Sequence, residues 1–479
     1  MVDHLYDRYL TMQTTENTVI SDIKVCGQGT LIPIFNGKHA RYINLDNAAS
    51  TPALIYVQEK VNEFLSWYSS VHRGAGFKSL LSTHTMEAGR NQLMEFVGAD
   101  SEEDCVIFVK NTTEAINKLA NRLELTKDDV VLTTLMEHHS NDLPWRSKAR
   151  TLHVETLEDG TLDLFDLEQK IDRHKGRLRL VTVTGASNVT GIMPPIYDIA
   201  ELAHAAGAQI LVDCAQLAPH RKIVMGPTTS PRHLDFIALS GHKMYAPFGT
   251  GALIGSKRIF SKGVPDYTGG GTIEVVTRDK VYWTSPPHSD EAGSPNVVGV
   301  IALNASLYVL SSIGMEAVAR HESELTAYAL EKLNQLKGIQ IFGSTKEVSL
   351  NDRLGVIAFS VAGVPHAKVA SILSFEGGIG VRNGCFCAHP YVLRLLGISP
   401  EDVEIHISYV LNGDRSQLPG LVRVSIGIYN TLADIDVFTA MLEKIISGDY
   451  QDDYVVNPTT GEYMPSNFDT RLLEQYFHS

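Results

Sequence analysis

The sequence is poor in cysteine, and it lacks long apolar runs. Five cysteines in 479 residues are too few for a disulfide-stabilised scaffold, and an odd number favours a reducing compartment. No apolar run of about 18 residues or more occurs, so we expect no transmembrane helix. The N-terminal stretch MVDHLYDRYL carries acidic side chains and no apolar core, which is not the pattern of a signal peptide. These absences predict a soluble, cytoplasmic protein.

Positive charge is also scarce. The chain has 41 lysine and arginine residues against 55 aspartate and glutamate residues, a formal net charge of −14. This balance argues against general binding to nucleic acid or anionic membranes, although it is compatible with a local basic pocket for a phosphate. Apolar residues make up 44% of the chain, as in ordinary globular proteins. A chain of this length is expected to form two domains.

Short apolar runs alternate with amphipathic stretches over much of the chain. Pro195–Ala206, for example, has apolar residues at the three- and four-residue intervals typical of a helix. This alternation predicts an α/β fold whose mostly parallel sheet carries helices on both faces. The expected buried strands are Cys105–Val109, Val130–Thr134, Leu178–Val183, Gln209–Val212 and Phe236–Leu239.

Two turn-rich stretches, Tyr267–Thr272 and Ser285–Gly293, interrupt this pattern. Beyond them, Val297–Ser311 is expected to form a long apolar helix that leads to a smaller α+β domain. The tail has weak periodicity and is expected to pack on the body or on a partner. We therefore expect an N-terminal segment (1–40), a large domain (41–300), a small domain (301–450) and a tail (451–479).

Two chemically active residues follow expected strands, at the edge where open α/β sheets bind their ligands. Lys243 comes soon after Phe236–Leu239, and Asp213 directly follows Gln209–Val212. A lysine that can lose its proton forms a Schiff base with a carbonyl, and a carboxylate beside a pyridine nitrogen keeps that nitrogen protonated. Taken alone, a lysine at such a position is more often solvated, and an aspartate at such a position is more often a helix cap. Together they predict a site for pyridoxal 5′-phosphate (PLP).

Further residues fit the same cofactor. Thr112 and Thr113 open the helix expected after the first strand, where hydroxyls and free backbone N–H groups bind phosphate. A capping box is the alternative explanation for these threonines. His138 follows Val130–Thr134 and would stack on a pyridine ring. The adjacent His139 raises the alternative of a metal, but no third ligand stands at a recognisable spacing, so no metal site is expected.

The chain resembles the fold-type I PLP enzymes of the class V aminotransferase group and, among them, the cysteine desulfurases. The resemblance covers about residues 41–444 and implies a large, mostly parallel-sheet domain with a smaller C-terminal α+β domain. Each motif by itself is common, whereas their shared order is specific. The motifs include LDNAA (Leu45–Ala49), VHRG (71–74), NTTEAIN (Asn111–Asn117), MEHHSNDLPW (Met136–Trp145), VDCAQ (Val212–Gln216), SGHKMYAPFGTG (Ser240–Gly251), EAGSPN (Glu291–Asn296), RNGCFCAHP (Arg382–Pro390) and RVSIGIYNT (Arg423–Thr431).

The resemblance implies a role for the residues at matching positions. Ser294 stands where the family usually has threonine, and it would reach the phosphate of the neighbouring subunit in a homodimer. The implied substrate-binding residues are Asn188 and Arg423, which would hold a carboxylate, together with Asn47 and Arg382. The implied cofactor residues are Lys243 as the imine lysine, Asp213 at the ring nitrogen, His138 on the ring face, Gln216 at the ring hydroxyl, and Thr112, Thr113, Ser240 and His242 at the phosphate.

Cys387 occupies the position of the desulfurase nucleophile. A thiolate is the nucleophile that attacks a substrate sulfur. Lone cysteines are more often small buried hydrophobic residues, but the glycine-rich, polar stretch Gly377–Pro390 favours a reactive thiol. The implied reaction removes sulfur from L-cysteine, with Lys243, His138 and Cys387 as catalytic residues. It gives alanine and a persulfide on Cys387, which passes to a sulfur-acceptor protein.

Other reactions stay open at this point. Cys385 replaces the histidine of the commonest pattern; it would relay a persulfide, form a bridge or simply pack. Residues 390–422 exceed what a compact desulfurase needs and would form a lid, a docking site for an acceptor or a pocket wall. A C–S lyase, a selenocysteine lyase, an epimerase or a molybdenum-cofactor-sulfurase-like enzyme of the same fold would also use Lys243 and PLP. A binding module without activity would lack Lys243 or Asp213.

Overall fold

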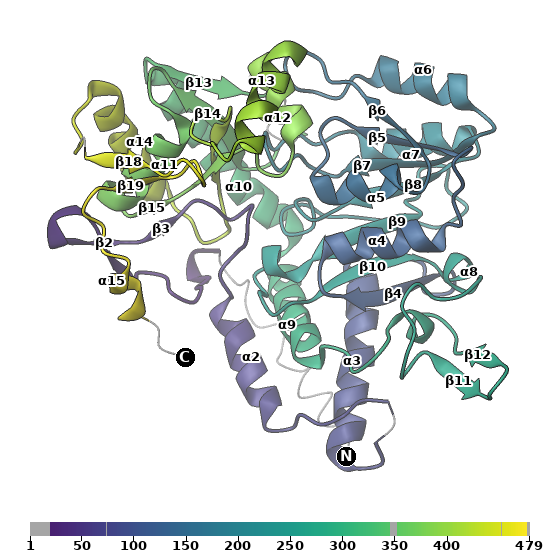
Figure 1. Cartoon of the computed structure of the whole chain (residues 1–479). Coiled ribbons are helices and arrows are strands. Elements are labelled where there is room, and N and C mark those ends of the chain that lie inside the picture. Colours follow the sequence, from purple (N-terminus) through teal and green to yellow (C-terminus); the bar gives the residue numbers. More distant parts are fainter. Residues whose placement is uncertain (1–19, 73, 345–351, 452, 477–479) are drawn as a thin grey trace.

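A seven-stranded sheet forms the centre of the larger part of the protein (Figure 1). The structure is a computed structural model, and it describes residues 20–72, 74–344, 352–451 and 453–476. Residues 1–10, whose composition argues against a signal peptide, lie outside the described residues. In the order in which they pair, the strands are β4 (Asp104–Val109), β10 (Gly251–Ser256), β9 (Phe236–Ser240), β8 (Gln209–Asp213), β7 (Leu178–Thr184), β5 (Val130–Thr134) and β6 (Arg150–Val154).

The sheet is mostly parallel because β9, β8, β7, β5 and β6 run in one direction, while β10 pairs antiparallel with both β9 and β4. In most of these strands, alternate residues enter two different cores. In β8, for example, Ile210 and Val212 join one core and Leu211 joins the other. Burial on both faces explains why these strands are continuous apolar runs. The α/β fold and the five strands expected from the sequence are thus confirmed.

Helices cover both faces of this sheet. On one face α4 contacts β9 and β10 and also packs on α5, while on the other face α7 contacts β7 and β8. The helix expected at Pro195–Ala206 is α7, and the apolar helix expected at Val297–Ser311 is α9. The helices around the sheet are α2 (Ile55–Leu65), α3 (Phe77–Phe96), α4 (Thr112–Arg122), α5 (Leu143–Arg146), α6 (Leu164–His174), α7 (Ile196–Ala205), α8 (Lys257–Phe260) and α9 (Val297–Ile313).

A second, antiparallel sheet has its own core, which includes residues of α10, α11 and α14. This α+β architecture agrees with the expectation for the C-terminal part, while the domain boundaries at 41, 301 and 451 stay a prediction. The sheet has the order β13 (Ile339–Phe342), β14 (Val356–Val361), β17 (Leu421–Ser425) and β16 (Arg382–Gly384). The helices of this part are α10 (Met315–Gln335), α11 (His366–Gly377), α12 (His389–Leu396), α13 (Pro400–Leu411) and α14 (Leu432–Ser447).

The segments before and after the two sheets pack back on the body. The N-terminal strand β3 (Ile43–Asn44) pairs with β15 (Ile379–Gly380), so the two parts of the chain are joined at this point. In the tail, the Ser371 hydroxyl of α11 donates to the Tyr463 carbonyl at 2.6 Å. The remaining segments near the chain ends are η1 (Ile20–Asp22), β1 (Leu31–Pro33), η2 (Phe35–Gly37), β2 (His39–Arg41), β18 (Tyr454–Val456), β19 (Tyr463–Pro465) and α15 (Arg471–Glu474).

Two features lie outside these layers. A hairpin of β11 (Ile273–Val276) and β12 (Val281–Trp283) projects from the larger part (Figure 1). The long stretch 390–422 forms most of α12 and all of α13, and α13 buries none of its residues.

Among the described residues, no single helix has the length and composition of a membrane span. Helices α9 and α10 have that length and composition only when taken together, as a pair bent by 79°.

Candidate active site

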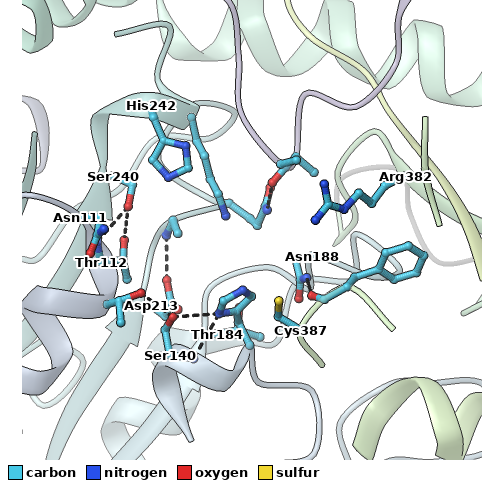
Figure 2. A pocket seen from close by; sticks show the side chains of 18 of the residues that line it. Asn111, Thr112, Ser140, Thr184, Asn188, Asp213, Ser240, His242, Arg382 and Cys387 are labelled. Carbon is cyan, nitrogen blue, oxygen red and sulfur yellow. Dashed lines mark hydrogen bonds between the residues drawn. The ribbon is translucent and has the colours of Figure 1, made fainter. Parts of the chain in front are cut away.

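A cavity of about 230 Å³ opens at the carboxyl ends of β7, β8 and β9. Of the residues expected to act in catalysis or to bind the cofactor or substrate, all line it except Asn47 and Ser294. Figure 2 shows the Ser240 and Thr112 hydroxyls at one end of the cavity and Cys387 with Arg382 at the other. The lining residues that sequence reasoning did not single out are Ala48, Ala49, Asn111, Ser140, Thr184, Ala215 and Phe386.

Lys243 enters the cavity from η4 (Gly241–Lys243), the 3-10 turn directly after β9. This turn requires Gly241, because a Cβ there would lie 2.7 Å from the Thr250 carbonyl oxygen. Burial lowers the pKa of Lys243 to about 8, and the carboxylate of Asp213 opposes that shift. The lysine is therefore closer than usual to the neutral form that a nucleophilic or basic amine requires.

Asp213 is the last residue of β8 and is buried. Its Oδ1 accepts a hydrogen bond from the Ala215 N–H at 2.9 Å. Burial raises the pKa of Asp213, whereas this hydrogen bond and Lys243 lower it. A buried carboxylate at a cavity wall is stabilised by a cationic partner, and a protonated pyridine nitrogen is such a partner.

One end of the cavity is lined by hydroxyl groups around the N-terminus of α4. The Ser240 Oγ lies 2.8 Å from both the backbone nitrogen and the Oγ1 of Thr112, and the Thr113 Oγ1 lies 2.7 Å from the Ser140 Oγ. The N-cap of α4 is Asn111, which accepts from the Glu114 N–H. The capping-box alternative therefore does not account for the two threonine hydroxyls, and the donors present suit a phosphate.

His138 caps η3 (His139–Asn141), with its Nδ1 accepting from the Ser140 N–H at 3.1 Å. Burial, assisted by the charge of Lys243, lowers the pKa of His138 to about 3. The ring is therefore neutral at physiological pH, as suits stacking on an aromatic cofactor.

Gln216 is held by its Nε2, which donates to the Ala48 carbonyl at 2.8 Å. The donors and acceptors present fit PLP.

Arg423, from β17, provides a cation at the end of the cavity that also contains Cys387. Its Nη1 donates to the Asn188 carbonyl at 2.9 Å, and its Nη2 donates to the Asp46 Oδ1 at 2.8 Å. Its guanidinium carbon lies 5.0 Å from the centre of the Phe386 ring. Asp46 thus occupies one arm of Arg423, a contact that the LDNAA motif gave no signal to predict.

Cys387 lies on an irregular loop after β16. Phe386 and Cys387 both have left-handed backbone angles, with φ of 52° and 56°, which are costly for residues with a Cβ. Neighbours hold this conformation: the Asn188 Nδ2 donates to the Phe386 carbonyl at 2.7 Å, and the His139 N–H donates to the Cys387 carbonyl at 2.8 Å. The Asn188 side chain is therefore bonded to the loop. Cys387 itself is exposed.

The second cysteine of this loop has a different environment. The Cys385 Sγ donates to the Pro419 carbonyl at 3.3 Å, and burial raises the pKa of Cys385 to about 11. A protonated thiol with a hydrogen-bond partner is a weak nucleophile, so packing is the role that these contacts favour for Cys385. Beside the loop, the rings of His139 and His389 stack with centroids 4.9 Å apart.

Two residues singled out from the sequence do not line the cavity. Asn47 is buried, and its amide is used in hydrogen bonds to the Ser425 carbonyl at 2.9 Å and from the Tyr429 hydroxyl at 2.7 Å. These bonds join the LDNAA segment to the loop after β17. Ser294 is exposed on the segment before α9, outside this chain's own cavity.

Comparison with known proteins gives consistent matches over most of the chain. A model of the class V aminotransferases matches residues 43–438. A probable cysteine desulfurase of Halalkalibacterium halodurans is 34% identical over 411 residues, covering 84% of this chain and 92% of that protein. A cysteine desulfurase of Dickeya dadantii is 36% identical over 422 residues, covering 86% and 93%.

Solved structures give the same result. The apo cysteine desulfurase from Thermococcus onnurineus NA1 has a TM-score of 0.74 and 32% sequence identity, covering 85% of this chain and 95% of that one. The cysteine desulfurase CsdA from Escherichia coli, in an S-sulfonic acid form, has a TM-score of 0.71 and 28% identity over the same shares.

Proposed function

The chain belongs to the class V aminotransferase family, a family of PLP enzymes that includes its cysteine desulfurase relatives, and we propose that it is a cysteine desulfurase acting on L-cysteine. One observation carries the proposal: the exposed thiol of Cys387 lines the same cavity as Lys243 and Asp213. A C–S lyase or an epimerase needs the lysine and the carboxylate but does not need a thiol at this position. Relatives named cysteine desulfurase at 34–36% identity support the choice.

PLP, when bound, withdraws electrons from the bonds around the substrate Cα. We propose that Lys243 holds it covalently and that Asp213 faces its ring nitrogen. His138 would lie against the ring and Gln216 at the ring hydroxyl. The phosphate would be bound by Thr112, Thr113, Ser240 and His242.

Lys243 would also move the substrate's Cα proton. With a pKa of about 8, a useful fraction of this amine is unprotonated at neutral pH, as a general base requires. Arg423 would bind the substrate carboxylate through a planar, charge-assisted contact. Since Asp46 already accepts from Arg423, the substrate competes with Asp46 for that arm. Asn188 would orient both Arg423 and the loop, and Arg382 would add positive charge.

Cys387 would take the sulfur. Its thiolate forms an S–S bond to the substrate sulfur while the substrate Cβ–S bond breaks. The electron pair of the broken bond stays on carbon, which is protonated, and alanine leaves. The balance is L-cysteine plus the Cys387 thiol giving alanine plus the Cys387 persulfide. An acceptor protein would then remove the outer sulfur.

Two further proposals concern the assembly and its surroundings. We propose a homodimer in which Ser294 reaches the partner's phosphate site, because this residue is exposed and does not line the cavity of its own chain. In a mixed dimer of one Ser294→Ala chain and one Lys243→Ala chain, one site would then keep both residues, and the other site would lose both.

We also propose a cytoplasmic location, since all five cysteines are free and a reducing compartment preserves such thiols.

The main test compares alanine and sulfide formation from L-cysteine by the wild type, Cys387→Ala and Cys385→Ala. Loss of the nucleophile should lower alanine formation by at least about a hundredfold while the cofactor absorbance is retained. Cys385→Ala is the matched control and should retain most of the activity, because its thiol is protonated and bonded to Pro419. Undiminished alanine formation by Cys387→Ala would contradict the nucleophile role of Cys387, whereas pyruvate in place of alanine would identify a C–S lyase.

A further inference from the structure

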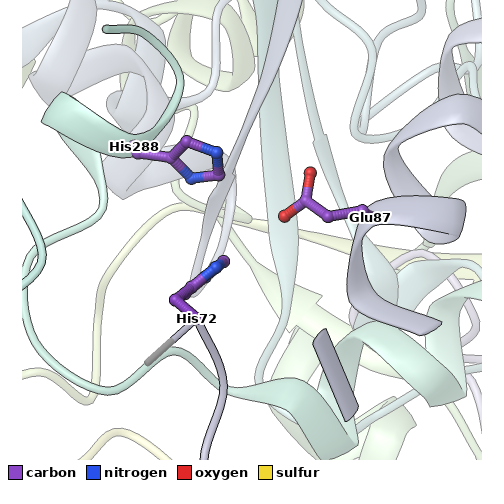
Figure 3. A group of neighbouring side chains, drawn as sticks. All are labelled: His72, Glu87 and His288. Carbon is purple, nitrogen blue, oxygen red and sulfur yellow. The ribbon is translucent and has the colours of Figure 1, made fainter. Parts of the chain in front are cut away.

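A second group of potential ligands converges outside the cavity, next to α3 (Figure 3). It consists of His72 in the loop before α3, Glu87 in α3, and His288 in η5 (His288–Asp290). One ligand atom from each residue lies within 4.8 Å of the other two. The two imidazole rings meet edge to face with centroids 5.1 Å apart. None of the three residues lines the cavity described above.

Among the described residues, the two imidazoles and one carboxylate oxygen of this group are unused, in contrast to the ligand atoms of a similar cluster. In the cluster of His204, His233 and Asp235, both nitrogens of each imidazole already have an oxygen partner. Within the described part of the chain, no hydrogen bond occupies a ring nitrogen of His72 or His288. The Glu87 Oε1 is a buried atom that likewise has no hydrogen-bond partner there. The Glu87 side chain is 38% exposed as a whole, but this oxygen is buried, and buried polar atoms usually have a partner.

The charge around Glu87 favours a cation. Glu87 Oε2 accepts from the Arg90 Nε at 3.0 Å, but both Nη atoms of Arg90 are already paired with the two carboxylate oxygens of Glu291, each at 2.6 Å. The single cation of Arg90 therefore faces the carboxylates of Glu87 and Glu291, and these three side chains together have a net charge of −1. The residual negative charge lies beside two imidazoles, which are neutral ligands when unprotonated.

Each ligand is positioned by its own element. The His72 N–H donates to the Thr83 Oγ1 of α3 at 2.8 Å, and the Ser69 N–H donates to the Ser82 Oγ at 3.1 Å, so the loop lies on the helix. His72 itself has a left-handed φ of 68°. His288 is anchored through its neighbour Asp290, which lies 3.3 Å from Arg122.

We propose that His72, Glu87 and His288 bind a divalent transition-metal ion, with zinc as the best match. Two imidazoles and one carboxylate form a common three-ligand zinc set that leaves a fourth position open. An ion placed among three atoms that are at most 4.8 Å apart can lie within about 2.8 Å of each, and bonds of about 2.1 Å then require shifts of up to roughly 0.7 Å. His72 is the exposed member of the group, whereas Glu87 and His288 are half-buried. The ion would tie the loop before α3 to η5.

The test is zinc binding by the full-length, PLP-loaded protein after removal of metal with a chelator. Titration with Zn²⁺ is done on the wild type and in a Cys387→Ser background, where the exposed thiol cannot bind. We expect one zinc per chain in the Cys387→Ser protein, with an affinity at least about tenfold lower after His288→Asn or Glu87→Gln, since each removes one of three ligands. His39→Ala, an exposed histidine of β2, is the matched control and should bind as before.

A second readout separates lost binding from misfolding. Zinc should raise the melting temperature of the Cys387→Ser and His39→Ala proteins, whereas His288→Asn and Glu87→Gln should melt at the same temperature with or without zinc. The inference would be overturned if the ligand variants bound zinc as tightly as the control, or if no zinc bound at all. Both readouts are independent of desulfurase activity.

Discussion

Replacing Asp235 tests whether two stacked histidines stabilise the sheet at the end opposite the cavity. Asp235 directly precedes β9, and its carboxylate accepts from the His204 Nε2 at 2.8 Å, from the His233 Nε2 at 3.3 Å and from the Ile210 N–H at 2.8 Å. The two rings stack with centroids 4.3 Å apart. These side chains are 12–17% exposed, so solvent screens the contacts only weakly.

The hydrogen bond to Asp235 raises the pKa of both His204 and His233, against the opposing effect of burial. Burial alone would raise the pKa of Asp235, but the two histidines hold it well below its usual range. Hydrogen bonds to charged groups contribute about 1.5–3 kcal/mol each. Allowing for the long His233 contact, we expect Asp235→Asn to lower the free energy of unfolding by about 3 kcal/mol, or the melting temperature by roughly 5 °C.

The effect should depend on pH in one direction. Because the folded pKa of each histidine lies above its unfolded value of 6.5, the network is fully effective below that value and weakens as pH rises through the folded pKa. The difference in melting temperature between wild type and Asp235→Asn should therefore be largest at about pH 6 and smaller at about pH 9.

Thermal melts followed by circular dichroism at both pH values measure this difference. Asp198→Asn is the matched control, because its partner Arg232 forms an exposed pair that contributes little. Cofactor absorbance should be normal in Asp235→Asn, since Lys243 lies at the other end of β9. The reasoning is refuted if Asp235→Asn melts within about 1 °C of the wild type at pH 6, or if the difference grows with pH.

Three further changes address the cavity. Ser240→Ala should weaken PLP binding by about 10- to 100-fold through loss of a charge-assisted hydrogen bond; unchanged affinity in a cofactor titration would contradict the proposed phosphate site. Asp46→Asn should lower the KM for L-cysteine by about tenfold, because the substrate no longer competes for Arg423; a higher KM would mean that Asp46 orients this arginine instead. Gly241→Ala should cost about 1–3 kcal/mol and disturb the lysine turn, because its Cβ meets the Thr250 carbonyl; a wild-type melt with normal cofactor absorbance would contradict this.

Several parts of the site could be predicted because their signals are local. Lys243 and Asp213 each follow an apolar run, and the carboxyl ends of such strands meet at one edge of a parallel sheet. The order of motifs along the chain added Gln216, Ser240 and His242, which also line the cavity. Thr184 could have been found by the same reasoning, since it is the last residue of β7.

The sequence by itself determined which segments become buried strands, because a continuous apolar run specifies burial on both faces wherever the chain places it. Only the tertiary structure decided which side chains meet across long separations. Arg423 pairs with Asp46, 377 residues away, and His72 and His288 meet although no spacing links them. It also decided that Cys387 is exposed while Cys385, two residues earlier, is half-buried. Such contacts depend on how separate elements pack, and a pattern of neighbouring residues carries no information about that geometry.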